Sequence, residues 1–206
     1  ELDWLVRMWQ SDGSVLSKVS VDAFQSASPA SSDKAPRYYG PASYASAITA
    51  ASVFAHSNLV IKGINGLGDY AKALLVKAEK SWTFLSQASF PQFSAAYKNT
   101  INNGFGSAAT EQDEHFYRFG YLSAAVYLFA ATGKQVYHDY FKNNYSAYES
   151  RFKYWWNQYD SVYEDAYLYY TRLNNADPAV KTEILNAFES QVKTAGHLMG
   201  AVNGRK

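Results

Sequence analysis

The densest group of side chains that could exchange protons or bind a metal is Asp113-Glu114-His115. Two carboxylates beside an imidazole could act as a general acid and base, or could coordinate a metal ion. The same residues stand where a predicted helix begins, and acidic side chains in a first turn interact favourably with the helix dipole. Asp113 and Glu114 are therefore catalytic candidates, and a charged first turn is the alternative.

A second pair of carboxylates, Glu164 and Asp165, lies within another predicted helix. Consecutive helical residues point to different faces, so one of the two could enter a cleft, where burial would raise its pKa. Both could instead be solvated. His56, His138 and His197 are each alone on a predicted helix, which is typical of packing or surface residues.

Aromatic side chains are unusually frequent, with 18 Tyr, 12 Phe and 5 Trp among 206 residues. Tyr and Trp combine an apolar face with a polar tip, which suits a cleft that binds sugar rings. The rings could equally fill contacts between helices. The main binding candidates are Trp155 and Trp156, which precede a predicted inner helix, with Tyr159 beside them. The alternative is that both Trp rings are core anchors.

Composition disfavours several other classes of protein. The 19 Lys and Arg balance 18 Asp and Glu, so the chain lacks the basic stripe that nucleic acid needs. The absence of Cys excludes disulfide scaffolds and thiolate metal sites. No P-loop, dinucleotide fingerprint or G-x-S-x-G elbow is present, and we expect no cofactor and no bound metal. No apolar run reaches the ~18–20 residues of a membrane span, so we expect no membrane partner.

The elements that must position these residues are mostly helices. Apolar spacing predicts helices at 1–9, 42–57, 69–85, 91–101, 115–131, 135–149, 159–173 and 178–199. We expect Pro41 at the first turn of its helix, Gly133 as a C-cap, and Asp177-Pro178 as an N-cap and first helical residue. Three times, a helix with little charge is followed by a turn and an amphipathic helix.

This repeat predicts three helical hairpins packed side by side, as an open solenoid or part of a ring. Three hairpins cannot close a ring, so their apolar edges would favour self-association. Residues 15–21 partly alternate and predict a short extended segment within an irregular loop at about 12–40. We expect one partial domain over residues 1–206. The chain carries no signal peptide, and both its ends look like breaks in a larger protein.

Several segments resemble glycoside hydrolase family 9. Residues 1–19, ELDWLVRMWQSDGSVLSKV, are similar to the family pattern L-x-W-L-x-x-M-Q-x-x-D-G-S-V-x-x-K-V. Residues 35–47 resemble its A-P-R-x-x-x-P-x-S-x-x-A-T-A stretch, and residues 70–82 resemble its next outer helix. The A-A-T-G at 130–133 stands where these enzymes have A-T-G between helices. The segments follow the order of the family and span most of the chain.

The resemblance implies an all-α fold of the (α/α)6 toroid type, of which this chain would form about half a ring. It also implies a secreted cellulase, an endo-β-1,4-glucanase that hydrolyses the glycosidic bond with inversion of configuration at the anomeric carbon. In such enzymes a base activates water and an acid protonates the leaving oxygen, with the two carboxyl groups ~6.5–9.5 Å apart. The family's base lies in a D-A-G-D motif upstream of the matched region and its acid lies downstream. The chain therefore looks like a truncated form without that pair; the alternative is a non-catalytic module that binds glucan or protein.

The resemblance also suggests where glucan would bind. The family places a sugar-stacking Trp near Trp155-Trp156. Four further residues stand in loops that the family keeps near its cleft: Lys18, Arg37, Tyr38 and Tyr39. Many members have His where Ser17 stands, and some have a Cys/His zinc site that cannot be intact without Cys. Gly120 and Ser123 replace an acidic and aromatic pattern, so we expect no metal or sugar contact there.

Overall fold

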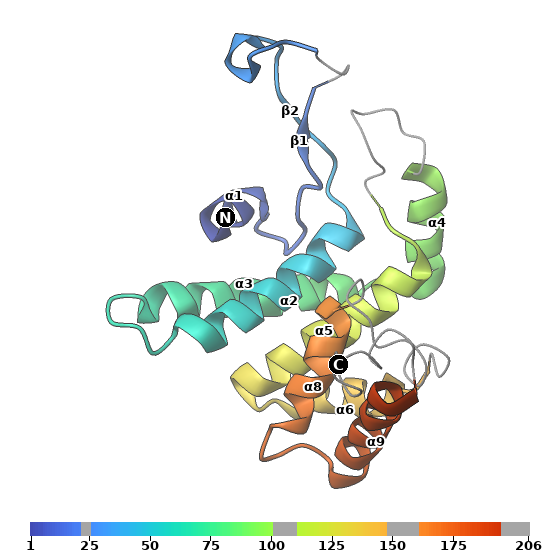
Figure 1. Cartoon of the computed structure of the whole chain (residues 1–206). Helices are drawn as coiled ribbons and strands as arrows, with labels where there is room; N and C mark the ends of the chain where they lie inside the picture. The colour runs from blue at the N-terminus through green and yellow to red at the C-terminus, as the bar shows by residue number, and fades with distance from the viewer. Residues whose placement is uncertain (22–25, 101–110, 148–160, 195–206) are drawn as a thin grey trace, which may run out of the picture. The chain divides into compact units, whose positions relative to one another are not determined.

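The computed structural model describes residues 1–21, 26–100, 111–147 and 161–194, which are mostly helical (Figure 1). The helices are α1 (Leu2–Met8), α2 (Tyr44–Ile61), α3 (Gly68–Ser86), α4 (Phe90–Thr100), α5 (Glu114–Thr132), α6 (Gln135–Asn144), α8 (Ser161–Thr171) and α9 (Pro178–Thr194). Two short strands, β1 (Val19–Ser20) and β2 (Tyr38–Tyr39), and a 3-10 turn at Ala30–Ser32 complete the described elements. The chain divides into two compact units, residues 1–124 and 125–206, and α5 contributes to both.

In the first unit, α2 and α3 run side by side as a hairpin (Figure 1). α2 is rich in small residues, and its buried residues include Ala47, Ala50, Ala51, Phe54 and Ala55. Small side chains allow close helix approach, and Asn58 adds a bond from its amide to the Ala71 carbonyl at 2.9 Å. α3 buries the apolar face that the sequence predicted, which consists of Leu74, Ala78, Trp82 and Leu85.

The start of α2 differs from our expectation. The prediction that Pro41 lies in the first helical turn is wrong, because Pro41 belongs to extended backbone and its carbonyl accepts from Ser17 N–H at 2.9 Å. The helix begins three residues later, behind Ser43, whose hydroxyl accepts from Ser46 N–H at 3.0 Å. A side-chain oxygen satisfies a free backbone donor there, which proline cannot do.

α2 is also relevant to the membrane prediction. By length and composition alone, its 18 residues are apolar enough to cross a membrane, with a mean hydropathy of 1.2. Half of that stretch is nevertheless buried inside the protein's own structure. A core helix that packs against its neighbours has the same composition, so this is weak evidence for a membrane span.

α5 is the inner helix that the sequence predicted. Its residues from Phe119 to Phe129 are all buried. A Cβ at Gly120 would lie 2.3 Å from Ile48 Cγ2, so glycine lets α5 lie close to α2 within the first unit. Gly133, at φ +70°, ends the helix and donates its N–H to the Phe129 carbonyl at 2.7 Å, which confirms the predicted C-cap.

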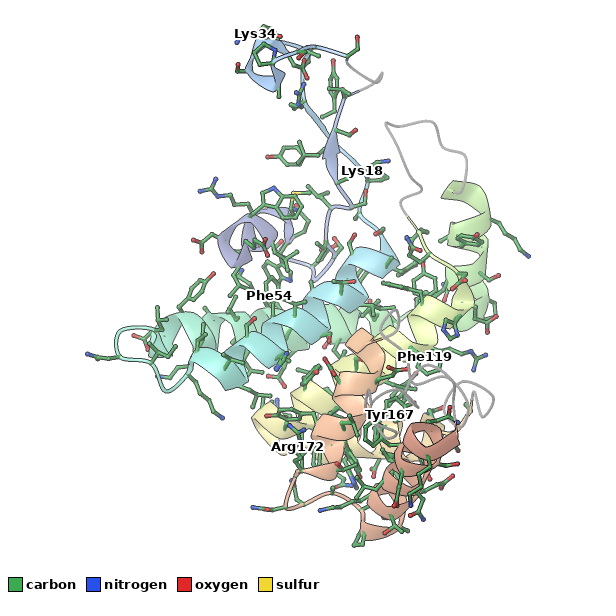
Figure 2. All side chains as sticks on the ribbon, viewed as in Figure 1. Lys18, Lys34, Phe54, Phe119, Tyr167 and Arg172 are labelled. Carbon is green, nitrogen blue, oxygen red and sulfur yellow. The ribbon has the colours of Figure 1, made fainter. Side chains whose placement is uncertain are left out.

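The second unit contains α6, α8 and α9 around an aromatic core. Phe141 packs at a tilt against Tyr170 and edge-to-face against Tyr167, with ring centroids 4.5 and 5.2 Å away (Figure 2 labels Tyr167). α9 begins at Pro178, and Asp177 Oδ1 accepts from the N–H groups of the next turn, as predicted. α6 ends at Asn144, five residues before the predicted end. The predicted ends of the helices at 159–173 and 178–199 lie partly outside the described residues.

The two strands form an antiparallel ribbon in the first unit. Val19 lies opposite Tyr39 and Ser20 lies opposite Tyr38. Below the strands, Gly40 donates its N–H to the Lys18 carbonyl at 2.7 Å, which continues the pairing toward α2. The predicted extended segment is therefore present, although only two of its residues form a strand.

Candidate functional site

The ribbon carries the four residues that the sequence placed near a cleft. Tyr38 and Tyr39 have 43% and 65% of their surface exposed, and Arg37 is exposed beside them. Lys18 is half-buried at the base of the paired region, and Lys34 lies toward the far end of the loop (Figure 2). Consecutive side chains of a strand point to opposite faces, so the ribbon presents one exposed phenol ring on each side, and each ring can stack on a flat ring.

An ion pair holds Arg37 within the loop. Its guanidinium lies 2.5 Å from the Asp33 carboxylate, and its other terminal nitrogen donates to the Ala35 carbonyl at 2.6 Å. The same carboxylate accepts from Ala35 N–H at 2.8 Å. The Arg37 hydrogen bond, followed by the Ala35 one, holds the pKa of Asp33 below its usual range. The Asp33 carboxylate therefore stays ionised at ordinary pH and keeps its ion pair with Arg37.

A tight turn supports the base of the ribbon. Asp12 Oδ1 accepts from both the N–H and the hydroxyl of Ser14, at 2.9 and 2.7 Å, and these bonds hold the pKa of Asp12 below its usual range. Gly13 has φ +93°, and a Cβ there would lie 2.3 Å from the Lys80 carbonyl oxygen. Both the backbone conformation and the close approach to α3 therefore require glycine. Val15 follows and is fully buried.

Ser81 of α3 connects this turn to α1. Its buried hydroxyl donates to the Gly13 carbonyl at 2.8 Å and accepts from the Trp9 indole N–H at 3.1 Å. Lys77 covers the Trp9 ring at 3.8 Å from the centroid, and Lys80 lies at 5.7 Å. Burial, with a smaller contribution from Lys80, lowers the pKa of Lys77. The D-G-S-V motif at residues 12–15 therefore has a structural role, because it anchors the base of the ribbon to α1 and α3.

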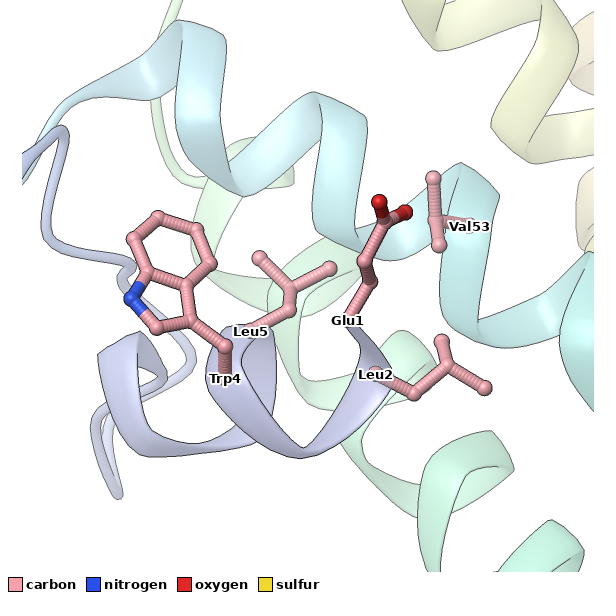
Figure 3. Close-up of a pocket in the computed structure, with 5 residues that line it drawn as sticks. All are labelled: Glu1, Leu2, Trp4, Leu5 and Val53. Atoms are coloured by element: carbon pink, nitrogen blue, oxygen red, sulfur yellow. The ribbon is translucent and has the colours of Figure 1, made fainter.

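Two open hollows lie along α1. One, of about 500 Å³, is lined by Glu1, Leu2, Trp4, Leu5 and Val53; Figure 3 shows the first four on and before α1, with Val53 on α2. The other, of about 280 Å³, includes Trp4, Leu16, Ser17 and Phe116. Within the described chain, Ser17 Oγ is buried without a hydrogen-bond partner. The linings are mostly apolar, and Trp4 remains 53% exposed.

A family model described as glycosyl hydrolase family 9 matches residues 1–203. The chain belongs to glycosyl hydrolase family 9. The resemblance predicted from residues 1–19, 35–47, 70–82 and 130–133 is therefore confirmed. A search of the curated proteins finds no match.

Solved structures of family 9 proteins share this fold. A metagenome-derived family 9 endoglucanase gives a TM-score of 0.75 at 22% identity, and a Bacteroides ovatus GH9 protein gives 0.70 at 22%. A single mutant of a thermostable endoglucanase from Alicyclobacillus acidocaldarius gives 0.75 at 19%. These matches cover 93%, 94% and 94% of this chain but 33%, 37% and 35% of the respective neighbours. The chain thus spans about a third of their length, and its fold is the predicted all-α, (α/α)6 toroid type in partial form.

The first acidic pair of this family 9 chain has the contacts of a charged first turn. Asp113 Oδ1 accepts from Phe116 N–H at 2.9 Å, as an N-terminal cap of α5. Glu114 pairs with Arg118 one turn later at 2.6 Å, and both side chains are partly exposed. The second pair lies on α8, where Glu164 is half-buried and Asp165 is exposed. Asp165 helps to raise the pKa of Tyr127 to about 12, although burial is the larger cause.

Sequence reasoning missed Glu111, a buried carboxylate with 4% exposure. It accepts from the backbone N–H groups of Tyr44 and Ala45, at 2.7 and 3.1 Å, and from the Tyr117 hydroxyl. Burial raises the pKa of Glu111, and the hydrogen bonds oppose that shift. Burial and Glu111 together raise the pKa of Tyr117. Glu111 thus holds the start of α2, and no local signal could reveal this because its partners lie 66 and 67 residues earlier.

The remaining candidate residues from the sequence do not take part in the contacts of the ribbon or of Glu111. Trp155, Trp156, Tyr159 and His197 lie outside the described residues. His138 is buried and hydrogen-bonded in the second unit. Within residues 1–21, 26–100, 111–147 and 161–194, no three His, Asp or Glu side chains gather closely enough to hold a metal ion.

Proposed function

We propose that the intact protein is a secreted cellulase-type enzyme that cleaves β-1,4-glucan with inversion, and that this chain supplies part of its glucan-binding surface. Membership of family 9 carries the proposal, together with the endoglucanases among the structural neighbours. The chain has no D-A-G-D motif for the base and no counterpart of the downstream acid. We therefore expect the 206-residue chain to bind glucan without hydrolysing it.

The ribbon is the part of this surface that the described residues support. Tyr39 and Tyr38 expose ring faces that can stack on the C–H face of a glucose unit, and stacking rigid rings costs little conformational entropy. Arg37 and Lys18 can donate hydrogen bonds to the ring hydroxyls beside them. Trp155, Trp156 and Tyr159 remain proposed stacking residues of the same surface.

The second candidate function is a non-catalytic helical-hairpin module. The apolar hollow along α1, with Trp4 and Val53 exposed, favours protein contacts. We propose that such apolar edges make the isolated chain self-associate. Sedimentation of the chain from 1 to 100 µM tests this, and a monomer throughout that range would reject self-association.

Binding to cellohexaose, followed by calorimetry and NMR, tests the glucan surface. We expect Tyr39→Ala to weaken binding about fivefold and Tyr38→Ala less, because removing one stacked ring costs about 1 kcal/mol. Tyr97→Ala on α4 is the matched control, a Tyr-to-Ala change away from the ribbon that should leave affinity unchanged. Equal affinity for all four proteins would reject the ribbon as the binding surface.

Release of reducing sugar from carboxymethyl cellulose tests the chemistry separately. We expect no release above a heat-killed control. Release would overturn the proposal that the chain lacks a catalytic pair. Asp113, Glu114, Glu164 and Asp165 would then be replaced by the matching amides one at a time, to find the group responsible.

A further inference from the structure

His138 on α6 is buried in the second unit, with 8% of its surface exposed. Its Nδ1 lies 2.8 Å from Gln135 Nε2, and its Nε2 lies 2.8 Å from the Tyr170 hydroxyl. The Phe129 ring covers the imidazole with centroids 4.6 Å apart. Both ring nitrogens are therefore engaged, Nε2 in a buried contact and Nδ1 beside the exposed residues Gln135 and Asp139.

The contacts of Gln135 determine which nitrogen carries the proton. Gln135 Nε2 also lies 2.8 Å from Asp139 Oδ1, and a carboxylate only accepts hydrogen bonds. The Gln135 amide therefore presents its NH2 group to both Asp139 and His138, so Nδ1 of His138 must be an acceptor. The neutral ring consequently carries its hydrogen on Nε2 and donates it to the Tyr170 oxygen.

Tyr170 passes this contact on to α9. Its oxygen also accepts from the Asp177 N–H at 2.8 Å, and Asp177 is the N-cap of α9. Burial raises the pKa of Tyr170, so its hydroxyl stays neutral at ordinary pH. A continuous series of bonds thus runs from α6 through α8 to the start of α9.

We propose that His138 is a pH-sensitive lock that holds α6 to the connection between α8 and α9, and that protonation opens it. A second proton can go only onto Nδ1, where it would face the Gln135 NH2 group at 2.8 Å. The imidazolium then turns toward Asp139 Oδ1, 4.0 Å away, and loses Tyr170, which breaks the series of bonds.

Asp139, Lys142 and Asp177 are the charged side chains beside this series of bonds. Asp139 on α6 attracts the imidazolium and directs it away from Tyr170. Lys142, also on α6, pairs with Asp177 at 2.5 Å. Their mutual hydrogen bond raises the pKa of Lys142 and lowers the pKa of Asp177, so both stay charged. α8 presents the neutral Tyr170, and α5 presents Phe129.

NMR of the full chain tests the two claims separately. Long-range nitrogen–proton spectra at pH 8 should show His138 as the Nε2–H tautomer. Hydrogen exchange, corrected for its intrinsic pH dependence, should show that protection of the Asp177 amide falls roughly tenfold from pH 7.5 to pH 5.5. Amides in the middle of α2 serve as the internal reference. An Nδ1–H tautomer, or constant protection of Asp177 while His138 becomes charged, would overturn the proposal.

Two variants sharpen the test. His138→Gln cannot gain a charge and should remove the pH dependence at Asp177, whereas His56→Gln, the matched control in the first unit, should retain it. Gln135→Glu supplies an acceptor for a charged Nδ1–H and should raise the pH at which His138 titrates by NMR. If His138→Gln does not fold, the wild-type tautomer and Gln135→Glu still decide the matter. A lower titration pH in Gln135→Glu would contradict the lock.

Discussion

Glu111 in the first unit and His138 in the second unit hold the start of a helix by different means. Glu111 accepts directly from two backbone N–H groups of α2, whereas His138 reaches the cap of α9 through Tyr170. The two groups also differ in their response to a proton. Burial raises the pKa of Glu111, so folding favours its protonated form, whereas the proposed lock has a second proton on His138 turn the ring toward Asp139 and away from Tyr170. Acid is therefore expected to keep the start of α2 in place and, through the proposed lock, to release the start of α9.

The largest effect expected from this comparison comes from Glu111→Ala. The substitution leaves two backbone donors and the Tyr117 hydroxyl without their acceptor in a buried site, which should lower the free energy of unfolding by about 3 kcal/mol. Urea unfolding, followed by circular dichroism, measures it. Glu79→Ala, on the partly exposed side of α3, is the control and should change stability by less than about 0.5 kcal/mol. A loss below about 1 kcal/mol for Glu111→Ala would mean that water replaces the carboxylate.

His138→Ala should cost less, about 2 kcal/mol, because it removes one bond to Tyr170 and leaves a small cavity under Phe129. The backbone donor of Asp177 keeps the Tyr170 oxygen as its acceptor. Urea unfolding at pH 8, where the lock is closed, measures the change. A loss larger than that of Glu111→Ala would reverse the ranking and show that the indirect series of bonds matters more than the direct cap.

The pH dependence of stability tests the raised pKa of Glu111. Because the folded pKa of Glu111 is raised, its stabilising contribution is complete below the unfolded pKa and is lost as pH rises through the folded pKa. Between pH 4 and pH 7, the wild type should therefore lose stability relative to Glu111→Gln as pH rises. Parallel curves for wild type and Glu111→Gln would mean that the hydrogen bonds cancel the effect of burial.

Local features explain which parts of the fold the sequence could predict. The Gly133 C-cap and the Asp177-Pro178 start depend on residues within one turn, and both were predictable. The prediction that Pro41 lies in a first helical turn failed because proline suits both a first helical turn and an extended ribbon. The hydrogen bond from Ser17 N–H to the Pro41 carbonyl decides between these two structures. The role of Glu111 depends on a helix start far away in the chain, where spacing carries no information.

The candidate site divides in the same way. The motif at residues 12–15 belongs to the segment that resembles the family most specifically. The physical requirement for glycine in this motif is the close approach of Gly13 to the Lys80 carbonyl of α3, and the sequence does not show that contact. The ribbon that groups Lys18 with Tyr39 has strands of only two residues, so their alternation is too short to predict the pairing. The family resemblance named these residues, and the backbone pairing shows how they come together.

The smallest effect is expected at Glu114, three residues after Glu111. Glu114 pairs with Arg118 on the surface of α5, and surface ion pairs contribute about 0–1 kcal/mol because solvent screens them. Glu114→Gln should therefore change the free energy of unfolding by less than about 0.5 kcal/mol, and 0.5 M NaCl should remove the difference. Urea unfolding at both salt concentrations, with Lys193→Gln in the exposed pair on α9 as a matched control, measures it. A salt-resistant loss above about 1 kcal/mol would mean that Glu114 contributes to the buried start of α2. The difference in burial between Glu111 and Glu114 would then not explain their different contributions to stability.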